Sequence, residues 1–253
     1  MSHFATRLPI VLIVSAQRFP VSWAAAFLVS SITLLFGCGG GGSGSSTTVN
    51  NQSCGVDSYQ PNYVAEMAAS SGQLLQWSAF PISVAYYNSD SWTFQMKAAA
   101  AAALNAWTSA SGGRITFTSS NDTSTADLTM KWELSETLGG NTVGLTTLTF
   151  SSSTIRDADI RLAAYDAPFV QRSLNDLTEI ATHEVGHALG IGGHSPVRSD
   201  LMYAYINPSS PVAPNSRDWN TLRTAYCDDF KSRSRAAITG PTQTITIACP
   251  NHE

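Results

Sequence analysis

The sequence contains few charged residues and no block of basic side chains. Asp, Glu, Lys and Arg together make up 13% of the 253 residues, and the formal net charge is -4. Proteins that bind nucleic acid neutralise its phosphates with clustered Lys and Arg, so we expect no nucleic-acid partner. The hydrophobic fraction of 43% is that of an ordinary globular domain with a rather neutral surface.

The apolar run near the N-terminus is too short to span a bilayer as a helix. Residues 21–36 form a run of 16 residues, whereas a spanning helix needs about 20. The run follows Arg7 and Arg18 and precedes small residues, which is typical of a signal peptide. The segment LFGC resembles the lipobox of bacterial lipoproteins, so Cys38 would be the lipid-bearing first residue of the mature chain. The alternative is a plain signal peptide with an incidental cysteine.

We therefore expect an exported protein, either anchored in the bacterial cell envelope by its lipid or secreted. Its membrane contact would be through that lipid alone, and we expect a monomer. In chain order the sequence predicts a signal peptide, a Gly/Ser-rich tether, a lead-in segment, one catalytic domain and a tail: residues 1–37, 38–53, 54–77, 78–227 and 228–253.

Cysteines are scarce, and their number in the mature chain is odd after the lipid-bearing one is set aside. Cys54, Cys227 and Cys249 remain. Exported proteins can form disulfides, but three cysteines cannot all pair. We favour a bridge between Cys227 and Cys249, which would close a short C-terminal loop.

Periodicity and capping signals predict an α+β fold. Alternating β-branched residues predict strands at 81–87, 114–118, 126–132, 142–150 and 157–163, with a further one in the tail at 244–249. Helices are predicted at 91–113, 173–190 and 216–227, with a short one near 63–70. Ser173 with Asp176 makes a capping box for the second of these helices, and Ser216 is the expected N-cap of the third.

The segment HEVGHALGIGGHS has the residue types and spacing of a metal site. His183 and His187 lie one helical turn apart, so both imidazoles can reach one ion. Glu184 is offset by about 100° around the helix, beside the metal, where a general base belongs. Gly190 lets the chain leave the helix in a left-handed conformation, and His194 can then return as a third ligand.

Together with the following SDLMYAY, this segment resembles the metzincin zinc peptidases and, within them, the matrixin branch. On this resemblance Met202 is the Met-turn methionine, an apolar floor beneath the zinc ligands. In matrixins the third histidine is followed by serine, and the methionine comes eight residues after that histidine. His194, Ser195 and Met202 have this spacing.

The usual pattern HExxHxxGxxH would place the third histidine one residue earlier, where Gly193 stands. The extra residue then belongs to the turn, in which Gly190, Gly192 and Gly193 can accept a positive φ and absorb it. Since some metzincins use aspartate as the third ligand, Asp200 is the alternative to His194.

The resemblance extends over residues 78–227 and includes FPISVAYY, AAALNAWTSASGGRITFT, ADIRLAA and SRDWNTLRTAY. It implies a metzincin-like fold: a mixed, mostly parallel, twisted five-stranded sheet with two helices, an active-site helix, a Met-turn and a C-terminal helix. Residues 88–182 contain no histidine, so the second, structural zinc of animal matrixins is not expected.

The implied activity is that of a zinc-dependent endopeptidase with one catalytic Zn²⁺. Glu184 would assist the attack of zinc-bound water on the peptide bond and pass the proton to the leaving amine. An extended protein or peptide substrate would pair with an edge strand near residues 146–150.

Two further features are weaker. Asp157 and Asp159 could hold Ca²⁺, although such residues more often form a solvated start of a strand. The segment CGVD, with Cys54, resembles the cysteine-switch segment of matrixin propeptides, and its thiolate could occupy the fourth zinc position. The alternative is that Cys54 is half of a disulfide or a tether cysteine.

Two other functions stay open at the level of sequence. The inserted glycine could weaken the peptidase, leaving a surface binding protein on a metzincin scaffold. A zinc hydrolase acting on a non-protein amide, such as one in the cell wall, would use the same residues.

Overall fold

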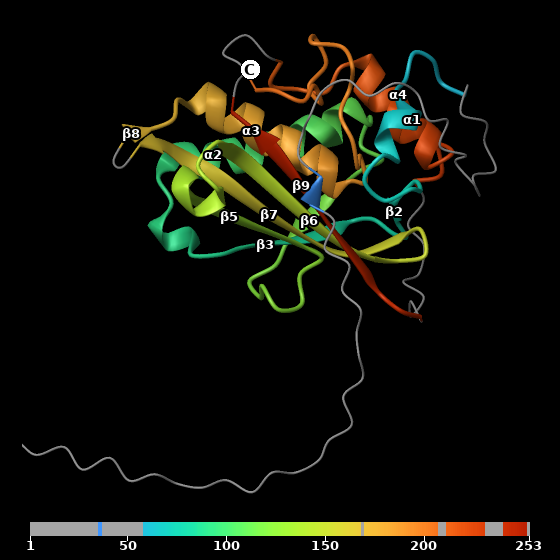
Figure 1. The fold of residues 1–253 in the computed structure, drawn as a ribbon. Helices are drawn as coiled ribbons and strands as arrows, with labels where there is room; N and C mark the ends of the chain where they lie inside the picture. The colour runs from blue at the N-terminus through green and yellow to red at the C-terminus, as the bar shows by residue number, and fades with distance from the viewer. Residues whose placement is uncertain (1–34, 37–57, 168–169, 207–210, 231–239, 252–253) are drawn as a thin grey trace, which may run out of the picture. The chain divides into compact units, whose positions relative to one another are not determined.

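The structure is a computed structural model that describes residues 35–36, 58–167, 170–206, 211–230 and 240–251 (Figure 1). All of them belong to one compact unit, Ser31–Glu253. Cys38, the tether and Cys54 lie outside the described residues, as does the predicted signal peptide except for the short strand β1. Within the described part of the chain, no helix has the length and hydrophobicity that crossing a membrane requires.

The predicted helices and strands are confirmed, with small shifts at their ends. The helices are α1 (Val64–Met67), α2 (Phe94–Ala110), α3 (Leu174–Ala188) and α4 (Ser216–Ala225), with 3-10 turns η1 (Ser89–Ser91) and η2 (Ser135–Leu138). The strands are β1 (Leu35–Phe36), β2 (Gln76–Trp77), β3 (Ile82–Tyr86), β4 (Phe117–Ser119), β5 (Leu128–Leu134), β6 (Thr142–Ser151), β7 (Thr154–Ala167), β8 (Val170–Gln171) and β9 (Gln243–Pro250).

The strands form one mixed, mostly parallel sheet, as predicted for an α+β metzincin-like fold. Its order is β1-β9-β6-β7-β5-β3-β4, and the short strands β2 and β8 pair with β7. Strands β4, β3, β5 and β7 run parallel, whereas β6 is antiparallel to β7. The sheet of the described residues has nine strands rather than the five predicted, because β9 and β1 extend it beyond β6 and the short strands β2 and β8 pair with β7.

The prediction that β6 offers an open edge is wrong for this chain. The tail strand β9 pairs antiparallel with β6 from Thr142 to Phe150, beside it in Figure 1. Thr146 lies opposite Ile247 and Leu148 opposite Ile245. The backbone that we expected to bind an extended substrate is therefore hydrogen-bonded to the chain's own C-terminal segment.

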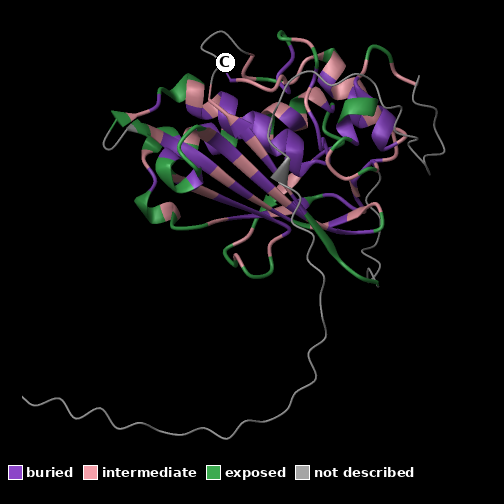
Figure 2. Cartoon of the chain, viewed as in Figure 1, coloured by how far each residue is buried: buried purple, intermediate pink, exposed green. Residues whose placement is uncertain are grey.

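Helices α2 and α3 pack against each other, and α3 also packs against β6 and β7. The face that α2 buries consists largely of alanines, with Met96 and Trp107 at its two ends. The Trp107 indole N–H donates to the Thr182 carbonyl at 2.8 Å, which fixes the two helices to each other. Nearly all of α3 after its first turn is buried, as Figure 2 shows.

Capping residues set where the two C-terminal helices begin. Ser173 is the N-cap of α3, as predicted, and its side chain accepts a hydrogen bond from the Asp176 N–H at 3.2 Å. The prediction of Ser216 as the N-cap of α4 is wrong by one residue. Asn215 caps this helix, and the Asp218 carboxylate accepts from the Asn215 N–H at 2.9 Å, which completes a capping box.

The lead-in segment is hydrogen-bonded to helix α4. The Tyr63 hydroxyl donates to the buried Asp218 carboxylate at 2.7 Å, and the Tyr63 N–H donates to the Thr221 hydroxyl at 3.1 Å. Helix α1 therefore lies against α4 (Figure 1), although the two are far apart in sequence.

Helix α1 also supports the glycine turn that follows α3. The Gly192 N–H donates to the Met67 carbonyl at 2.9 Å. A Cβ on Gly193 would lie 1.8 Å from the Glu66 carbonyl oxygen, and one on Gly192 would lie 2.8 Å from that of Met67. Gly190 alone of the three turn glycines has a positive φ, +110°. Gly192 and Gly193 therefore do not use the positive φ that a glycine can accept, and their missing Cβ atoms instead allow the backbone of α1 to approach.

Replacing Gly193 by Ala tests this packing. Because the new methyl group meets backbone rather than a flexible side chain, we expect the free energy of unfolding to fall by about 1–3 kcal/mol, as for other overpacked sites. Chemical denaturation measures this fall, with Ser199→Ala, an exposed site in the same loop region, as the control. Equal stability of the two variants would contradict the close approach of α1.

Candidate metal centre

Helix α3 brings two histidines to one buried point. His183 and His187 are four residues apart, and their Nε2 atoms are 3.1 Å apart. Both side chains are buried. Their ring centroids are 4.8 Å apart, with the rings roughly perpendicular, so the two nitrogens converge as the helical spacing predicts.

Backbone carbonyls orient both imidazoles. The His183 Nδ1 lies 2.8 Å from the Leu201 carbonyl oxygen, and the His187 Nδ1 lies 2.5 Å from that of Ile191. Because a carbonyl can only accept, each Nδ1 carries the proton and each Nε2 presents a lone pair. Fixing the outer nitrogen in this way is how proteins prepare histidines for a metal ion.

The histidines are also held neutral. Burial lowers the pKa of His183 to about 4 and that of His194 to about 3. Burial, followed by the influence of the neighbouring histidines, lowers the pKa of His187 well below its ordinary value. Metal binding requires the unprotonated imidazole, so the three side chains are in the form that an ion needs.

His194 joins this pair from the turn after α3. Its ring centroid is 4.8 Å from that of His187 and 5.3 Å from that of His183. The sequence spacing relates His194 and Ser195 to Met202. In the structure Ser195 and Met202 are in direct contact, since the Ser195 N–H donates to the Met202 carbonyl at 2.7 Å. The longer glycine turn therefore delivers His194 to the site.

Asp200, the alternative ligand, is engaged elsewhere. Its carboxylate accepts from the Ser195 hydroxyl at 2.5 Å and from the Asn215 amide at 2.8 Å. It also forms an ion pair with Arg217 at 3.1 Å. Among the described residues, the group that could hold a metal contains His194 and lacks Asp200.

The fourth member of the cluster is Cys249, which our sequence analysis placed in a disulfide. Its Sγ lies 3.3 Å from the Nε2 atoms of both His183 and His187, and 3.4 Å from that of His194. Cys227 is disulfide-bonded, whereas Cys249 keeps its thiol. The predicted bridge between Cys227 and Cys249 is therefore wrong.

The cysteine that the sequence suggested for the fourth zinc position was Cys54, not Cys249. Cys54, our candidate for a switch cysteine, lies outside the described residues, so its role stays a prediction. The sequence signals for Cys249 were the odd cysteine count and the alternating strand TITIAC that ends on it. Neither signal places that strand beside the histidines.

The four donors fit a tetrahedral zinc site. With Zn–N distances of about 2.0–2.1 Å and a Zn–S distance of about 2.3 Å, two nitrogens lie about 3.3 Å apart and a nitrogen and a sulfur about 3.6 Å apart. The separations are 3.1 Å for the His183–His187 nitrogen pair and 3.3–3.4 Å for the three nitrogen–sulfur pairs, and all four donor atoms lie within 4.8 Å of one another. Imidazole and thiolate are also the ligand types that zinc favours.

Glu184 lies beside the cluster and faces β6. Its carboxylate is buried, and Oε2 accepts a hydrogen bond from the Thr146 hydroxyl at 2.5 Å. Burial raises the pKa of Glu184 to about 7, against hydrogen bonds from Thr146 and Cys249 that lower it. A Cβ on Gly144 would lie 2.0 Å from Oε1, so the glycine in β6 makes room for this carboxylate.

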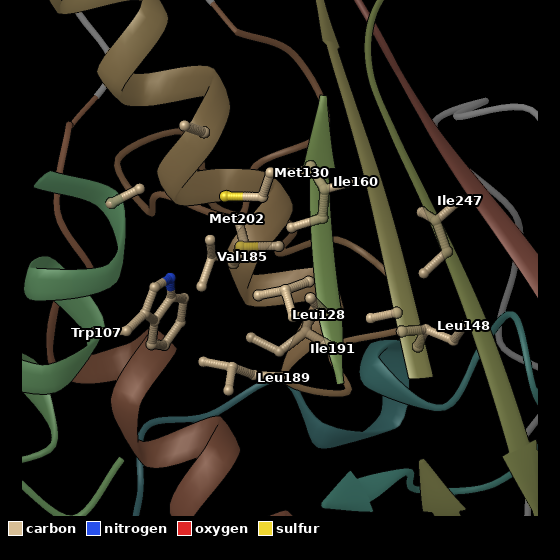
Figure 3. Close-up of a cluster of buried hydrophobic side chains, with 14 of the residues drawn as sticks. Trp107, Leu128, Met130, Leu148, Ile160, Val185, Leu189, Ile191, Met202 and Ile247 are labelled. Carbon is tan, nitrogen blue, oxygen red and sulfur yellow. The ribbon is translucent and has the colours of Figure 1, made fainter. Parts of the chain in front are cut away.

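Met202 packs beneath the helix that carries the ligands. It is fully buried among core side chains that include Trp107 and Val185 (Figure 3). A Cβ on Gly186 would lie 2.4 Å from the Met202 sulfur and 2.8 Å from Trp107 Cζ2, so the glycine of HEVGH lets both side chains pack closely against the helix.

One residue that supports the Met-turn escaped the sequence analysis. Asp218, whose side chain is buried, accepts hydrogen bonds from the N–H groups of Leu201 and Met202 at 3.2 and 3.4 Å. Its place in the first turn of the predicted helix was the only sequence signal, and an acidic residue there indicates capping of the helix rather than support of a turn.

The calcium expectation gains no support from the surroundings of its residues. Asp157 and Asp159 line a cavity of about 570 Å³ together with Lys131 and Arg161, whose positive charges oppose cation binding. Asp159 accepts from the Thr129 hydroxyl at 2.5 Å. Calcium binding here stays a prediction.

The helix with two histidines and a glutamate, the third histidine after a glycine turn and the methionine below them define the metzincin class of zinc peptidases. The matrixin family model matches residues 77–227, which is more than half of the chain. The protein therefore belongs to the matrixin family and is a metallopeptidase of the zinc-dependent type. No curated protein matches the chain.

The choice between His194 and Asp200 can be tested by zinc content. Losing a residue that only orients a metal ligand weakens metal binding by up to about 100-fold. Because His194 would bind the metal directly, we expect His194→Ala to weaken zinc binding by more than that. Asp200→Asn, the matched control, should keep zinc because Asp200 bonds to Ser195 and Arg217 instead. Zinc per chain after dialysis measures both, and the reverse pattern would make Asp200 the third ligand.

Proposed function

We propose that the protein is a zinc-dependent endopeptidase that hydrolyses protein or peptide substrates with Glu184 as its general base. The observation that carries this proposal is the buried Glu184 carboxylate beside the cluster of His183, His187 and His194. These side chains come from one helix and the turn that follows it, so the base and the metal ligands are positioned by the same element.

His183, His187 and His194 would hold one zinc ion. When bound, zinc polarises a carbonyl group and lowers the pKa of water. The three histidines supply neutral nitrogen donors for it, and the packing of Met202 under the helix keeps these donors in place. The burial of His183 and His187 also keeps bulk water away from these donors, which strengthens electrostatic interactions there.

Glu184 is positioned to move one proton. The hydrogen bond from Thr146 holds Oε2 of the carboxylate, which leaves Oε1, on the side of Gly144, to take a proton from the attacking water. The same carboxyl group then delivers that proton to the nitrogen of the leaving amine. Each proton transfer uses the same residue, so no second general acid is required.

The backbone of β6 is the expected docking edge for the substrate. A peptide can add to a sheet as an extra strand through its main-chain hydrogen bonds. The antiparallel pairing of β9 with β6 supports this proposal, because an extended segment of the chain itself already pairs with this edge. The position of His194 argues against the alternative of a binding protein with a broken metal site.

We further propose that the protein is exported. The N-terminal pattern of Arg residues, an apolar run and small residues supports a signal peptide, and LFGC supports lipidation at Cys38. On this proposal the peptidase acts in the bacterial cell envelope or outside it, as a monomer held by a lipid or released.

Glu184→Gln tests the mechanism. We expect kcat/KM for a peptide library or casein to fall by about 10²–10⁴-fold, the usual contribution of general acid–base catalysis, while one zinc per chain is retained. Glu136→Gln, an exposed site, is the control and should be unaffected. Both variants are measured in the native chain and combined with Ile245→Asp, because β9 covers the β6 edge and a charge at this buried position of β9 weakens its docking. Unchanged cleavage by Glu184→Gln would rule out this base.

A further inference from the structure

We propose that residues 240–251 are an inhibitory segment that occupies the substrate site as a built-in peptide, with Cys249 as a fourth zinc ligand that keeps the peptidase latent. This inference rests on the proposed peptidase function. The family match ends at residue 227, so the segment lies beyond the part of the chain that defines a matrixin.

The first observation is the strand pairing. β9 follows β6 from Thr142 to Phe150 with a single shift in register, between Thr142 and Gly144. A substrate that adds a strand to β6 needs the same N–H and C=O groups of β6. Since each of these groups can pair with only one neighbouring strand, the tail and a substrate exclude each other.

The second observation is that the tail is held on both sides after the cysteine. The Asn251 N–H donates to the Asn141 carbonyl at 2.7 Å, and Asn251 forms a parallel bridge with Ile206. Ile206 lies shortly after the Met-turn, so the end of the tail is joined both to the segment before β6 and to the segment after the Met-turn.

The third observation is the pattern of burial along β9. Ile245, Ile247 and Cys249 are buried, whereas Thr244 is exposed and Thr246 is half-buried. This alternation is that of a strand with one apolar face turned toward the protein. The thiol is the last side chain of the inward-facing row, so docking of the two isoleucines delivers it to the histidines.

The fourth observation is the completeness of the donor set. Catalytic zinc sites have three protein ligands and keep one position open, whereas four protein ligands make a closed site. The Cys249 sulfur lies within 3.4 Å of all three histidine nitrogens, which completes a four-ligand set. On binding zinc the thiol releases its proton to solvent, and its thiolate takes the position that a substrate or water requires.

Register places the thiol beside the base as well. Cys249 lies opposite Gly144, and Gly144 is the residue whose missing Cβ accommodates the Glu184 carboxylate. The thiol therefore occupies the space between the metal ligands and the general base. Removal of the thiol or displacement of β9 should open that space.

The test uses the full-length chain loaded with zinc and three variants. Cys249→Ala removes the thiol that would anchor the tail at the metal, so strand pairing and packing alone hold β9 and a substrate displaces it more easily. Ile245→Asp keeps the thiol and weakens the docking of the strand, because it places a charge on a buried position. Thr244→Ala changes an exposed residue of the same strand and is the matched control.

We expect Cys249→Ala and Ile245→Asp each to raise kcat/KM for a peptide substrate by at least about tenfold, since a tethered competitor acts at an effective concentration near the millimolar range. Thr244→Ala should leave it unchanged. A second readout is independent of catalysis: Co²⁺-loaded native chain and Thr244→Ala should show a thiolate-to-cobalt charge-transfer band in the near ultraviolet. Cys249→Ala should lack this band.

The outcomes separate this inference from the proposed function. Native chain with full activity, no thiolate band and a Cys249 that alkylates equally fast with and without zinc would overturn the inference and leave the peptidase function intact. A thiolate band that disappears in Cys249→Ala, without peptide cleavage by any variant, would support the thiol as a ligand and overturn the peptidase function.

Discussion

The metal centre depends on the convergence of three neutral imidazoles on one point. Such a cluster forms only if each ring is held in one orientation and one tautomer, because a ring that turns away or takes up a proton cannot bind a metal ion. Carbonyl groups of Leu201 and Ile191 provide this constraint for His183 and His187. Both carbonyls belong to segments after α3, so the shape of those segments determines whether the helix carries a working site.

Several elements that are distant in sequence hold these segments in place. Helix α1 lies against the glycine turn, where Gly192 and Gly193 allow backbone to approach backbone. Asp218 of α4 accepts hydrogen bonds from the Met-turn N–H groups and from Tyr63 of the lead-in segment. The lead-in segment therefore helps to hold the metal centre in place and is more than a linker that precedes the catalytic domain.

The features that could be predicted from the sequence are those with a local cause. The N-cap at Ser173 and the histidine spacing of α3 depend on residues within a few positions of each other. The position of Cys249 could not be predicted, because it requires β9 to pair with β6 so that the thiol meets a histidine 62 residues earlier. Gly193 was recognised as unusual, but the reason for a glycine there is the Glu66 carbonyl, a contact between distant segments.

The central claim is that three histidines and Cys249 share one zinc ion, and X-ray absorption at the zinc edge of the full-length protein tests it most directly. We predict a first shell of three nitrogens at about 2.0–2.1 Å and one sulfur at about 2.3 Å. A shell made only of nitrogen and oxygen atoms, with no sulfur, would contradict the claim.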